Sequence, residues 1–437
     1  MDLFTSLSLH YPSSLVSSLK ESMEGKSVHA LYRNPLKISE SDLLSLTSSL
    51  KSHPFVPNAY YFDPEVEELG KSMLFNLGAF YILDAASLLV PYFLNPKPGE
   101  RILDMAAAPG GKTCLSAMMM EGEGVILSND LSFSRSKETS SNVERLGLSN
   151  VAVTSGDFAA AYRNYESYFD AVLLDAPCSG SAMIRKDPRL LSDWSEEKVA
   201  RCASIQKELL DLASKMVVNG GRIMYSTCSF SYEEDEAVVL DFLKTHPQFH
   251  AFSVEEHEGF YHHEDLKEGV HLFPHLYAGE GQFFCLLQKE GEKESHPIER
   301  SKPLKMPSSI LPYIKESGLE SCDLKLHSGA YYGLTEALRI EGLSLLRYGV
   351  RIGEEKNPFS PDHALAVFNH RIPSISLEKE KALAYLRGET FPQQVSDGYH
   401  VVSYLKMNLG WVKVTHGIAK NHYPKGLRRR YSDPLNP

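Results

Sequence analysis

The sequence predicts an α/β protein built around a parallel, doubly wound sheet, with smaller regions on either side of it. Between residues 99 and 289, short apolar runs alternate with amphipathic stretches of helical length, the pattern of strands joined by crossover helices. The chain has 437 residues, 43% hydrophobic and 23% charged, so it can form two or three domains with sizeable cores. Ligands bind such sheets outside the carboxyl ends of the strands. The residues that follow the apolar runs are therefore the candidates for function.

The expected elements follow in order along the chain. Residues 1–95 mix short helical patterns with proline-rich joints, and the apolar segment Gly78–Ser87 predicts a buried helix leading into the sheet. Strands are expected at Arg101–Met105, Val125–Ser128, Val151–Val153, Phe169–Leu174, Gly221–Tyr225 and Gln282–Leu287. Helices are expected near Thr113–Met120, Phe133–Leu146, Glu196–Val217 and Tyr232–Thr245. The polar segment Glu290–Lys302 predicts a linker, and the remainder to Pro437 has short strands and helices of its own.

Composition and the chain start indicate where the protein works. No apolar run approaches the length of a membrane span, and the longest candidate, residues 79–94, carries Asp84. The N-terminus has no basic region followed by an apolar run and a cleavage site, so export is not expected. Six cysteines at irregular spacing do not make a disulfide framework. We expect a cytoplasmic monomer whose thiols are reduced and free for chemistry.

The charge is distributed unevenly. The net charge of −11 argues against indiscriminate nucleic-acid binding. From Gly398 to Ser432, however, there is no acid, and the basic residues there are Lys406, Lys413, Lys420, Lys425 and Arg428–Arg430. Such a stretch is either a solvated terminal tail, which a charge run alone favours, or the electrostatic footprint of a nucleic-acid partner.

The turn after the first predicted strand, Ala106–Thr113, is rich in small residues. A phosphate-binding P-loop would need glycine at position 106, which is alanine, and a dinucleotide fingerprint needs more than Gly110 and Gly111. A third interpretation is a cofactor-binding turn, in which main-chain amides at a helix N-terminus approach a ligand's carboxylate or ribose. The alternative is a tight strand-to-helix turn without a ligand.

Acidic residues follow three successive strands. Asp130 can accept two hydrogen bonds from a ribose diol, and Asp157 can hold an adenine amino group or simply cap a helix. Asp175 follows the next strand. One such acid alone would indicate a cap, but three in succession outline a pocket for an adenosine ligand.

Two cysteines lie in similar settings, because Cys178 in Asp175–Gly180 and Cys228 in Ser226–Ser229 each follow an apolar run. A thiol just beyond a core strand is placed for chemistry, and two of them suggest an enzyme that makes and then breaks a covalent bond to its substrate. Buried cysteines are usually inert, and that interpretation is adopted for Cys114, Cys202, Cys285 and Cys322.

Methylation of cytosine at carbon 5 needs this set of groups. Thiolate attack at carbon 6 makes carbon 5 nucleophilic, an acid near ring N3 lowers the barrier, and a base must later remove the carbon-5 proton. Cys228, Asp175 and Cys178 can fill these roles if the fourth and fifth strands are neighbours. The 53 residues from Asp175 to Cys228 suit one crossover helix between adjacent strands.

Several motifs, in order, resemble those of the Sun-type RNA cytosine-5 methyltransferases. They are Asp104–Thr113, Asp175–Gly180, Arg185–Pro188, Ser226–Ser229, Glu233–Glu236, Phe273–His275 and Gly279–Phe284. The resemblance covers roughly residues 70–289 and implies a Rossmann-like, seven-stranded class I methyltransferase domain that uses S-adenosyl-L-methionine. Where many relatives have glutamine this chain has Leu83, so no role is transferred to that position.

The resemblance also implies roles. Cys228 would be the nucleophile and Cys178 would assist product release, while Asp175 would protonate or hydrogen-bond N3. Lys112 would orient substrate or cofactor near the reacting base. The implied cofactor site consists of Ala106, Ala107, Ala108, Pro109, Gly110, Gly111, Lys112, Asp130, Asp157 and Asp175.

The C-terminal segments Leu409–Lys413 and Lys420–Arg428 resemble the RNA-binding region of the bacterial RsmF-type small-subunit rRNA methyltransferases. This implies 16S rRNA as the substrate, naked or in the small subunit, with a flipped or unpaired target cytosine. RNA contacts are expected from Lys420, Asn421, Lys425 and Arg428, with His416 and His422 on the same basic face. The expected domains are an N-terminal RNA-binding extension (1–95), an α/β methyltransferase domain (96–290), a small α+β domain (303–375) and a PUA-like RNA-binding module (376–437).

Two other functions stay open. A tRNA-directed enzyme would have the same motifs, although the C-terminal module disfavours it. A non-catalytic ribosome-assembly or RNA-binding protein would not need Cys228, Cys178 and Lys112 intact. Serine hydrolase chemistry lacks its G-x-S-x-G motif. His262, His263, His271 and His275 lack usable ligand spacing, so they predict loop histidines and no metal site.

Overall fold

The structure is a computed structural model of the chain and describes residues 1–293, 299, 301, 303–356, 359–368 and 372–428. Most of the predicted linker Glu290–Lys302 lies outside the described residues. Arg429 and Arg430 of the basic stretch also lie outside them, as does the end of the expected PUA-like module through Pro437. Within the described part, no helix has the length and apolar character needed to cross a membrane.

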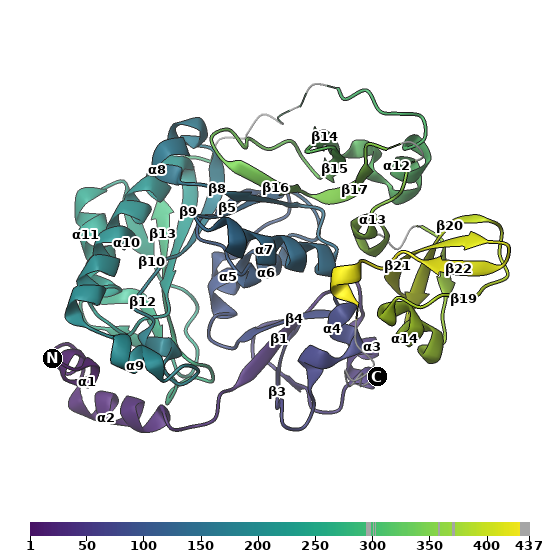
Figure 1. The fold of residues 1–437 in the computed structure, drawn as a ribbon. Coiled ribbons are helices and arrows are strands. Elements are labelled where there is room, and N and C mark those ends of the chain that lie inside the picture. The colour runs from purple at the N-terminus through teal and green to yellow at the C-terminus, as the bar shows by residue number, and fades with distance from the viewer. Residues whose placement is uncertain (294–298, 300, 302, 357–358, 369–371, 429–437) are drawn as a thin grey trace.

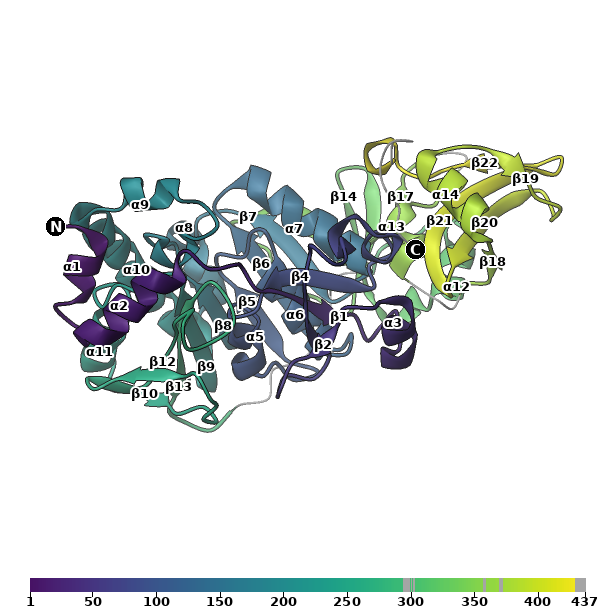
Figure 2. The ribbon, with the colours of Figure 1, turned by 90° about the horizontal axis from the view of Figure 1, so that it is seen from below.

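The N-terminal region forms a four-stranded antiparallel sheet with helices around it, preceded by a helical pair. Its elements are α1 (Leu3–Leu7), α2 (Ser13–Ser22), β1 (His29–Arg33), α3 (Glu40–Leu46), β2 (Lys51–Ser52), β3 (Ala59–Phe62), α4 (Met73–Asn76) and β4 (Phe80–Asp84), with strand order β2-β3-β1-β4. Helices α1 and α2 do not pack on this sheet. They pack beside helices α9 (Arg189–Asp193) and α10 (Glu196–Met216), at the end of the molecule opposite the C-terminal strands (Figure 2).

The central sheet has ten strands, and five of them are parallel. Its strands are β5 (Arg101–Asp104), β6 (Val125–Asp130), β7 (Val151–Ser155), β8 (Phe169–Asp175), β9 (Val217–Thr227), β10 (Phe249–Phe252), β11 (Tyr261–His263), β12 (Leu266–Leu272), β13 (Gln282–Lys289) and β16 (Ser344–Tyr348). The order is β11-β12-β13-β9-β8-β5-β6-β7-β16, with β10 on β13, and the parallel strands are β9, β8, β5, β6 and β7. The predicted Rossmann-like sheet is confirmed. Among its seven central strands, β13 runs antiparallel to its neighbours β9 and β12, so β12 has the same direction as the parallel strands.

Helices cover both faces of this sheet (Figure 1). The helices are α5 (Leu89–Leu94), α6 (Gly111–Met119), α7 (Phe133–Leu146), α8 (Phe158–Ala161), α9 (Arg189–Asp193), α10 (Glu196–Met216) and α11 (Glu236–Thr245). Alternate residues of one strand enter different cores: Leu103 packs with α10 and α11, whereas Ile102 packs with α5, α6 and α7. Strands buried on both faces are near-continuously apolar, which is why their runs are readable in the sequence.

The C-terminal region contains two further small sheets. Its elements are α12 (Leu311–Ser317), β14 (Asp323–His327), β15 (Ala330–Leu334), β17 (Val350–Glu354), α13 (His363–Phe368), β18 (Ser374–Ser376), α14 (Lys379–Arg387), β19 (Phe391–Pro392), β20 (Gly398–Tyr404), β21 (Met407–Thr415) and β22 (Ile418–Asn421). The sheets have strand orders β14-β15-β17 and β18-β20-β21-β22-β19. β16 pairs antiparallel with β7, so residues 344–348 belong to the central sheet and not to a separate small domain.

Two expectations about elements were wrong. Gly78–Ser87 is not a buried helix, because Phe80–Asp84 forms β4 and pairs with β1. A short apolar run cannot be assigned to helix or strand by periodicity, and here the pairing partner lies about 50 residues upstream. The helix expected from about Tyr232 begins only at Glu236, because residues 232–235 form turns closed by backbone hydrogen bonds to Ser231 and Tyr232.

Candidate active site

The carboxyl ends of β8 and β9 bring the two predicted catalytic thiols together. These strands are parallel neighbours, with Asp175 opposite Ser226, as the crossover interpretation required. Cys178 and Cys228 follow them directly, and their Sγ atoms lie 3.0 Å apart, at hydrogen-bond distance. Both side chains are half-buried. The two cysteines are 50 residues apart in the sequence but are in direct contact in the structure.

The surroundings of Cys178 disfavour its thiolate. The hydrogen bond with Cys228, burial, and the nearby carboxylates of Glu234 and Asp175 hold the pKa of the Cys178 thiol well above its usual value. These surroundings favour the protonated form of Cys178. A Cys178 thiol that donates to the Cys228 sulfur stabilises negative charge on Cys228.

One buried carboxylate holds both cysteine loops. Glu234 has no exposed surface, and it accepts hydrogen bonds from the Ser179 amide (2.8 Å) and the Ser229 hydroxyl (2.7 Å). The Ser179 hydroxyl and Gln206 Nε2 donate to it as well. Since Ser179 and Ser229 each follow one of the two predicted catalytic cysteines, Glu234 ties the two cysteine loops together. The motif Glu233–Glu236 was recognised in the sequence, but this function of Glu234 was not predicted.

This arrangement predicts that two substitutions of Glu234, by alanine and by glutamine, will differ in their effects on kcat and stability. Glu234→Ala should lower kcat on the order of 100-fold, because small displacements of reacting groups have effects of that size. It should also lower the free energy of unfolding by about 1–3 kcal/mol, since buried donors lose their acceptor. Glu234→Gln, which keeps an acceptor of the same shape, should recover much of both. The measurements are single-turnover methylation and denaturant unfolding.

The adjacent Glu233 supplies the matched control, because its side chain is 44% exposed and its ion-pair partner is His10 at 3.4 Å. Glu233→Ala should leave kcat unchanged. If Glu234→Ala lowers stability but leaves kcat unchanged, the carboxylate does not position the thiols.

Asp175 and Lys112 form a partly buried ion pair beside the thiols. Lys112 Nζ donates to Asp175 Oδ2 at 2.7 Å, while Ser226 and Gln282 donate to Oδ1 at 2.7 and 3.2 Å. Burial alone would lower the pKa of Lys112, but the Asp175 carboxylate, with a smaller effect from Cys228, raises it above its usual value. Lys112 is thus a permanent cation close to both Asp175 and Cys228.

The small-residue turn connects β5 to α6 as predicted. Gly110 has φ +95°, a left-handed conformation, and a Cβ atom there would come within 2.7 Å of Thr139. The Ala107 amide donates to Asn129 O at 2.8 Å and the Ala108 amide to Asp130 Oδ2 at 3.2 Å. These bonds tie the turn to the end of β6, next to the predicted ribose-binding acid.

A cavity of about 240 Å³ lies against this turn, and its lining includes Asp104, Ala106–Pro109, Lys112 and Asp175. Asp104 is 1% exposed, and its Oδ1 atom has no hydrogen-bond partner in the described part of the chain. Burial raises the pKa of Asp104 to about 7, against the lowering effect of a Thr113 hydrogen bond. Such an oxygen needs a donor, and an ammonium group in this cavity would provide one.

Two other predicted cofactor acids, Asp130 and Asp157, are not among the residues that line this cavity, and both already accept hydrogen bonds. Asp130 accepts from the Ser132 amide at 2.8 Å and has a lone pair left on each oxygen for a diol. Asp157 is exposed and caps α8 by accepting from the Ala159 amide at 2.8 Å. The capping alternative for Asp157 is therefore realised, and contact with adenine stays a prediction.

Residues from distant segments complete the cavity and were not predicted as site residues. Asp84 at the end of β4 lines it and accepts from the Glu280 amide at 2.8 Å. Lys186 lines it too, next to Arg185, whose guanidinium forms a buried ion pair with Glu280 at 2.7 Å. Asp84 was not predicted because residues 78–87 were expected to form a helix. An acid at the end of a strand indicates a binding site more strongly than an acid inside a helix.

The histidine expectation needs correction. His262 and His263 lie in β11 and His271 lies in β12, so they are not loop residues. In the described chain, Asp235, Glu236 and His271 are close enough together to hold a metal ion. Two of these groups already bind each other, because His271 Nε2 lies 2.7 Å from Glu236 Oε1 and 3.1 Å from the Tyr11 hydroxyl. These hydrogen bonds explain why the polar side chains of His271 and Glu236 can be buried without a metal ion.

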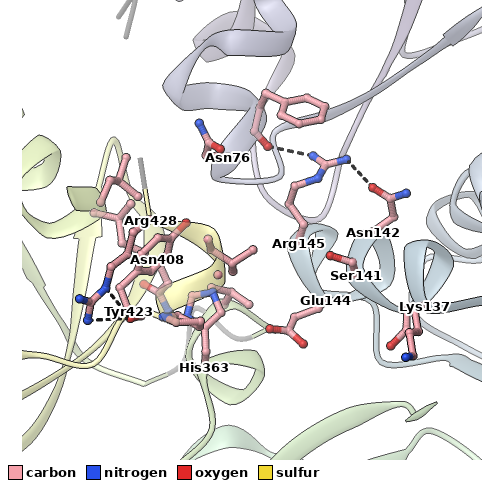
Figure 3. Close-up of a pocket in the computed structure, with 18 of the residues that line it drawn as sticks. Asn76, Lys137, Ser141, Asn142, Glu144, Arg145, His363, Asn408, Tyr423 and Arg428 are labelled. Carbon is pink, nitrogen blue, oxygen red and sulfur yellow. Dashed lines mark hydrogen bonds between the residues drawn. The ribbon is translucent and has the colours of Figure 1, made fainter. Parts of the chain in front are cut away.

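The predicted RNA-binding residues lie at the end of the C-terminal sheet. Lys420 and Lys425 are exposed. Asn421 Nδ2 donates to Tyr385 O and Glu389 O at 2.8 and 3.1 Å, so this amide joins β22 to α14. Arg428 is half-buried, donates to Tyr423 O at 3.4 Å and lines a cleft against α7 (Figure 3).

Comparison with known proteins identifies the family. The family model of the 16S rRNA methyltransferases RsmB/F matches residues 91–288, and that of the RsmF PUA domain matches residues 372–429. A protein named ribosomal RNA small subunit methyltransferase F from Escherichia coli (strain SE11) is 36% identical over 441 residues, covering 91% of this chain and 89% of that protein. Its namesake from Shewanella loihica is 30% identical over 440 residues, covering 91% and 88%.

Solved structures agree on the fold. A methyltransferase homolog from Pyrococcus horikoshii is 29% identical, with a TM-score of 0.57 over 65% of this chain and 93% of that one. NSun6 from the same organism, 21% identical, has a TM-score of 0.60 over 67% and 98% of the two chains. The motifs, the Rossmann-like sheet and relatives matched over nine-tenths of the chain lead to one conclusion: this chain belongs to the RsmF family of RNA methyltransferases.

Proposed function

We propose that the protein methylates carbon 5 of a cytosine in small-subunit rRNA through a covalent cysteine–cytosine intermediate, with S-adenosyl-L-methionine as the methyl donor. The observation that carries this proposal is the contact of Cys178 with Cys228 beyond two adjacent strand ends, beside the Lys112–Asp175 pair. Methyl transfer to an already nucleophilic atom would need no thiol, whereas carbon 5 of cytosine must first be activated.

The cofactor fits the cavity at the turn. Its ammonium group would meet the unpartnered Asp104 oxygen, the N-terminus of α6 at Gly111 and Lys112 would face its carboxylate, and Asp130 would accept from its ribose. When bound, S-adenosyl-L-methionine supplies an electrophilic methyl group.

Cys228 is the attacking thiolate in this proposal. Lys112 supports negative charge on it, and the Cys178 thiol, whose sulfur is 3.0 Å away, would donate a hydrogen bond to it. The Cys228 sulfur adds to carbon 6, and the ring electrons move toward carbon 5. N3 gains a proton in this step, either from Asp175 in its protonated form or from solvent, and in the second case the Asp175 carboxylate accepts the hydrogen bond of the new N3–H. Lys112, Ser226 and Gln282 hold the Asp175 oxygens in place. A carboxylate there favours the protonated ring.

Cys178 becomes the releasing base only after attack. The largest cause of its raised pKa is the hydrogen bond with Cys228. Once the Cys228 sulfur is bonded to carbon 6, it no longer carries charge, so the pKa of Cys178 falls. Its thiolate can then take the carbon-5 proton, the electron pair re-forms the ring double bond, and Cys228 leaves as thiolate. The 3.0 Å contact thus supports an ordered use of the two thiols.

The choice of rRNA follows from the relatives, which are named as ribosomal RNA small subunit methyltransferases, and from the match to an RsmF PUA domain. A cytoplasmic location follows from this substrate.

Bisulfite sequencing of rRNA and tRNA from cells lacking the protein tests the substrate. We expect one or more 5-methylcytosines to disappear from small-subunit rRNA while tRNA stays unchanged, and expression of the wild-type protein to restore them. Loss confined to tRNA would replace rRNA by the tRNA alternative, and an unchanged pattern in both would contradict the proposal.

A further inference from the structure

Another cavity, separate from the one at the cofactor turn, lies where three parts of the molecule meet, and neither Cys178 nor Cys228 lines it. This interdomain cleft has a volume of about 820 Å³ (Figure 3). One wall is α7, with Lys137, Ser141, Asn142 and Arg145. Tyr423 and Arg428 of the C-terminal region stand on the facing side, and Asn76 of the N-terminal region lies above them in this view.

The lining of the cleft is positive although the protein is acidic. Its basic side chains are Lys137, Arg145, Arg347 and Arg428, whereas the one acid among the lining residues is Glu144. Glu144 is ion-paired with Arg347, so it offsets one cation and no more. In a chain with a net charge of −11, such a local excess marks a site for an anionic partner.

The cations stand on both walls and are held in place. The Arg145 guanidinium stacks on the Phe75 ring at 4.0 Å and donates to Phe75 O at 2.8 Å. Lys137 is exposed on the same helix, two turns closer to its N-terminus. Arg428 lines the facing side of the cleft, where its guanidinium donates to Tyr423 O at 3.4 Å (Figure 3). It is the first residue of the Arg428–Arg430 run, whose other two residues lie outside the described chain.

Helix α7 connects this cleft to the catalytic region. Asn142, in the cleft wall, donates to Pro109 O of the cofactor turn at 3.1 Å. Arg135 near the start of the same helix lies 3.7 Å from Asp130. A chain lying in the cleft is therefore separated from the cofactor turn by the width of a single helix, which is about 10 Å.

We propose that the interdomain cleft binds the ribose–phosphate backbone of substrate RNA outside the target nucleotide. Lys137 and Arg428 would contact phosphates from the two walls, and Ser141 and Asn142 would add polar contacts. Lysine and arginine combined with serine and asparagine form the usual donor set for phosphate oxygens. That the bound chain is substrate RNA rests on the proposed function. The inference adds that one part of this RNA, outside the target nucleotide, lies in the interdomain cleft.

The test compares two charge-reversal variants of the full-length protein. One is Lys137→Glu with Arg428→Glu, and the control is Arg201→Glu with Lys244→Glu, two exposed cations on α10 and α11. The probe is small-subunit rRNA transcribed in vitro, titrated at several salt concentrations. For the cleft variant we expect the Kd to rise at least about tenfold and the slope of log Kd against log salt to fall by about 2, one per lost phosphate contact.

Ser141→Asp provides a second variant, since it adds a negative charge to the exposed α7 wall of the cleft. It should weaken RNA binding without changing the affinity for S-adenosyl-L-methionine. If both cleft variants bind rRNA with the Kd and salt slope of the control, the cleft does not bind RNA. Weakened binding to an acidic peptide but not to rRNA would also overturn the proposal.

The two proposals fail differently. If rRNA binding depends on the cleft but carbon 5 is not methylated, the proposed reaction is wrong and the proposal of RNA binding in the cleft stands. Normal methylation with cleft-independent binding would remove the cleft alone.

Discussion

Replacing Cys228 by alanine is expected to abolish methyl transfer and, with it, every covalent complex between protein and RNA. The expected loss in kcat is at least about 10,000-fold, because removing the nucleophile of a covalent mechanism leaves only binding and orientation. Lys112 and Asp175 stay in place in this variant, so the affinities for S-adenosyl-L-methionine and RNA should not change. Transfer of a labelled methyl group to rRNA and equilibrium binding measure these quantities separately.

Cys322→Ala is the matched control, because Cys322 is also a free, half-buried thiol but belongs to the C-terminal region. It should retain full activity. Measurable methylation by Cys228→Ala would mean that the thiol at the end of β9 does not attack the base.

Replacing Cys178 by alanine should have the opposite effect on the covalent complex. Attack by Cys228 stays possible, but no thiolate is available to take the carbon-5 proton. The RNA is therefore expected to remain attached to Cys228 after methylation. On a denaturing gel, the variant should show a band of protein bound to RNA that depends on S-adenosyl-L-methionine, and turnover should stop after one cycle.

The pair of variants is informative because the substitutions are chemically identical and the sites are 3.0 Å apart. A general loss of packing would affect both alike. If neither variant accumulated the complex and both lost activity equally, a release role for Cys178 would be untenable. A Cys178→Ala, Cys228→Ala double variant should form no complex.

The central sheet could be predicted from sequence because its strands are buried on both faces. The runs around Val172 and Ile223 are apolar without alternation, and they end at the predicted site residues Asp175 and Cys228. For the same reason, the sequence alone predicts that Cys178 and Cys228 share one site. What the residues alone left open was which thiol attacks. That assignment came from the family resemblance, and the raised pKa of the Cys178 thiol agrees with it.

Features that depend on distant partners could not be predicted in this way. Glu234 lies in a run of acids that resembles a solvated surface, yet it is buried because donors from residues 179, 206 and 229 converge on it. β4 and β16 are short, and their pairing with β1 and β7 is set by contacts far away in the sequence. Lys137 resembles any exposed helix residue in the sequence, and only the fold brings Arg428 to the other side of the cleft.

The most direct test of the mechanism identifies the sulfur atom that is bonded to the RNA. Wild-type protein would be incubated with S-adenosyl-L-methionine and rRNA whose target cytosine carries fluorine at carbon 5. Fluorine cannot leave as a proton does, so the intermediate should be trapped. Digestion and mass spectrometry should find the methylated nucleotide on the peptide that contains Cys228 and none on the peptide that contains Cys178. Attachment through Cys178, or no attachment at all, would contradict the account.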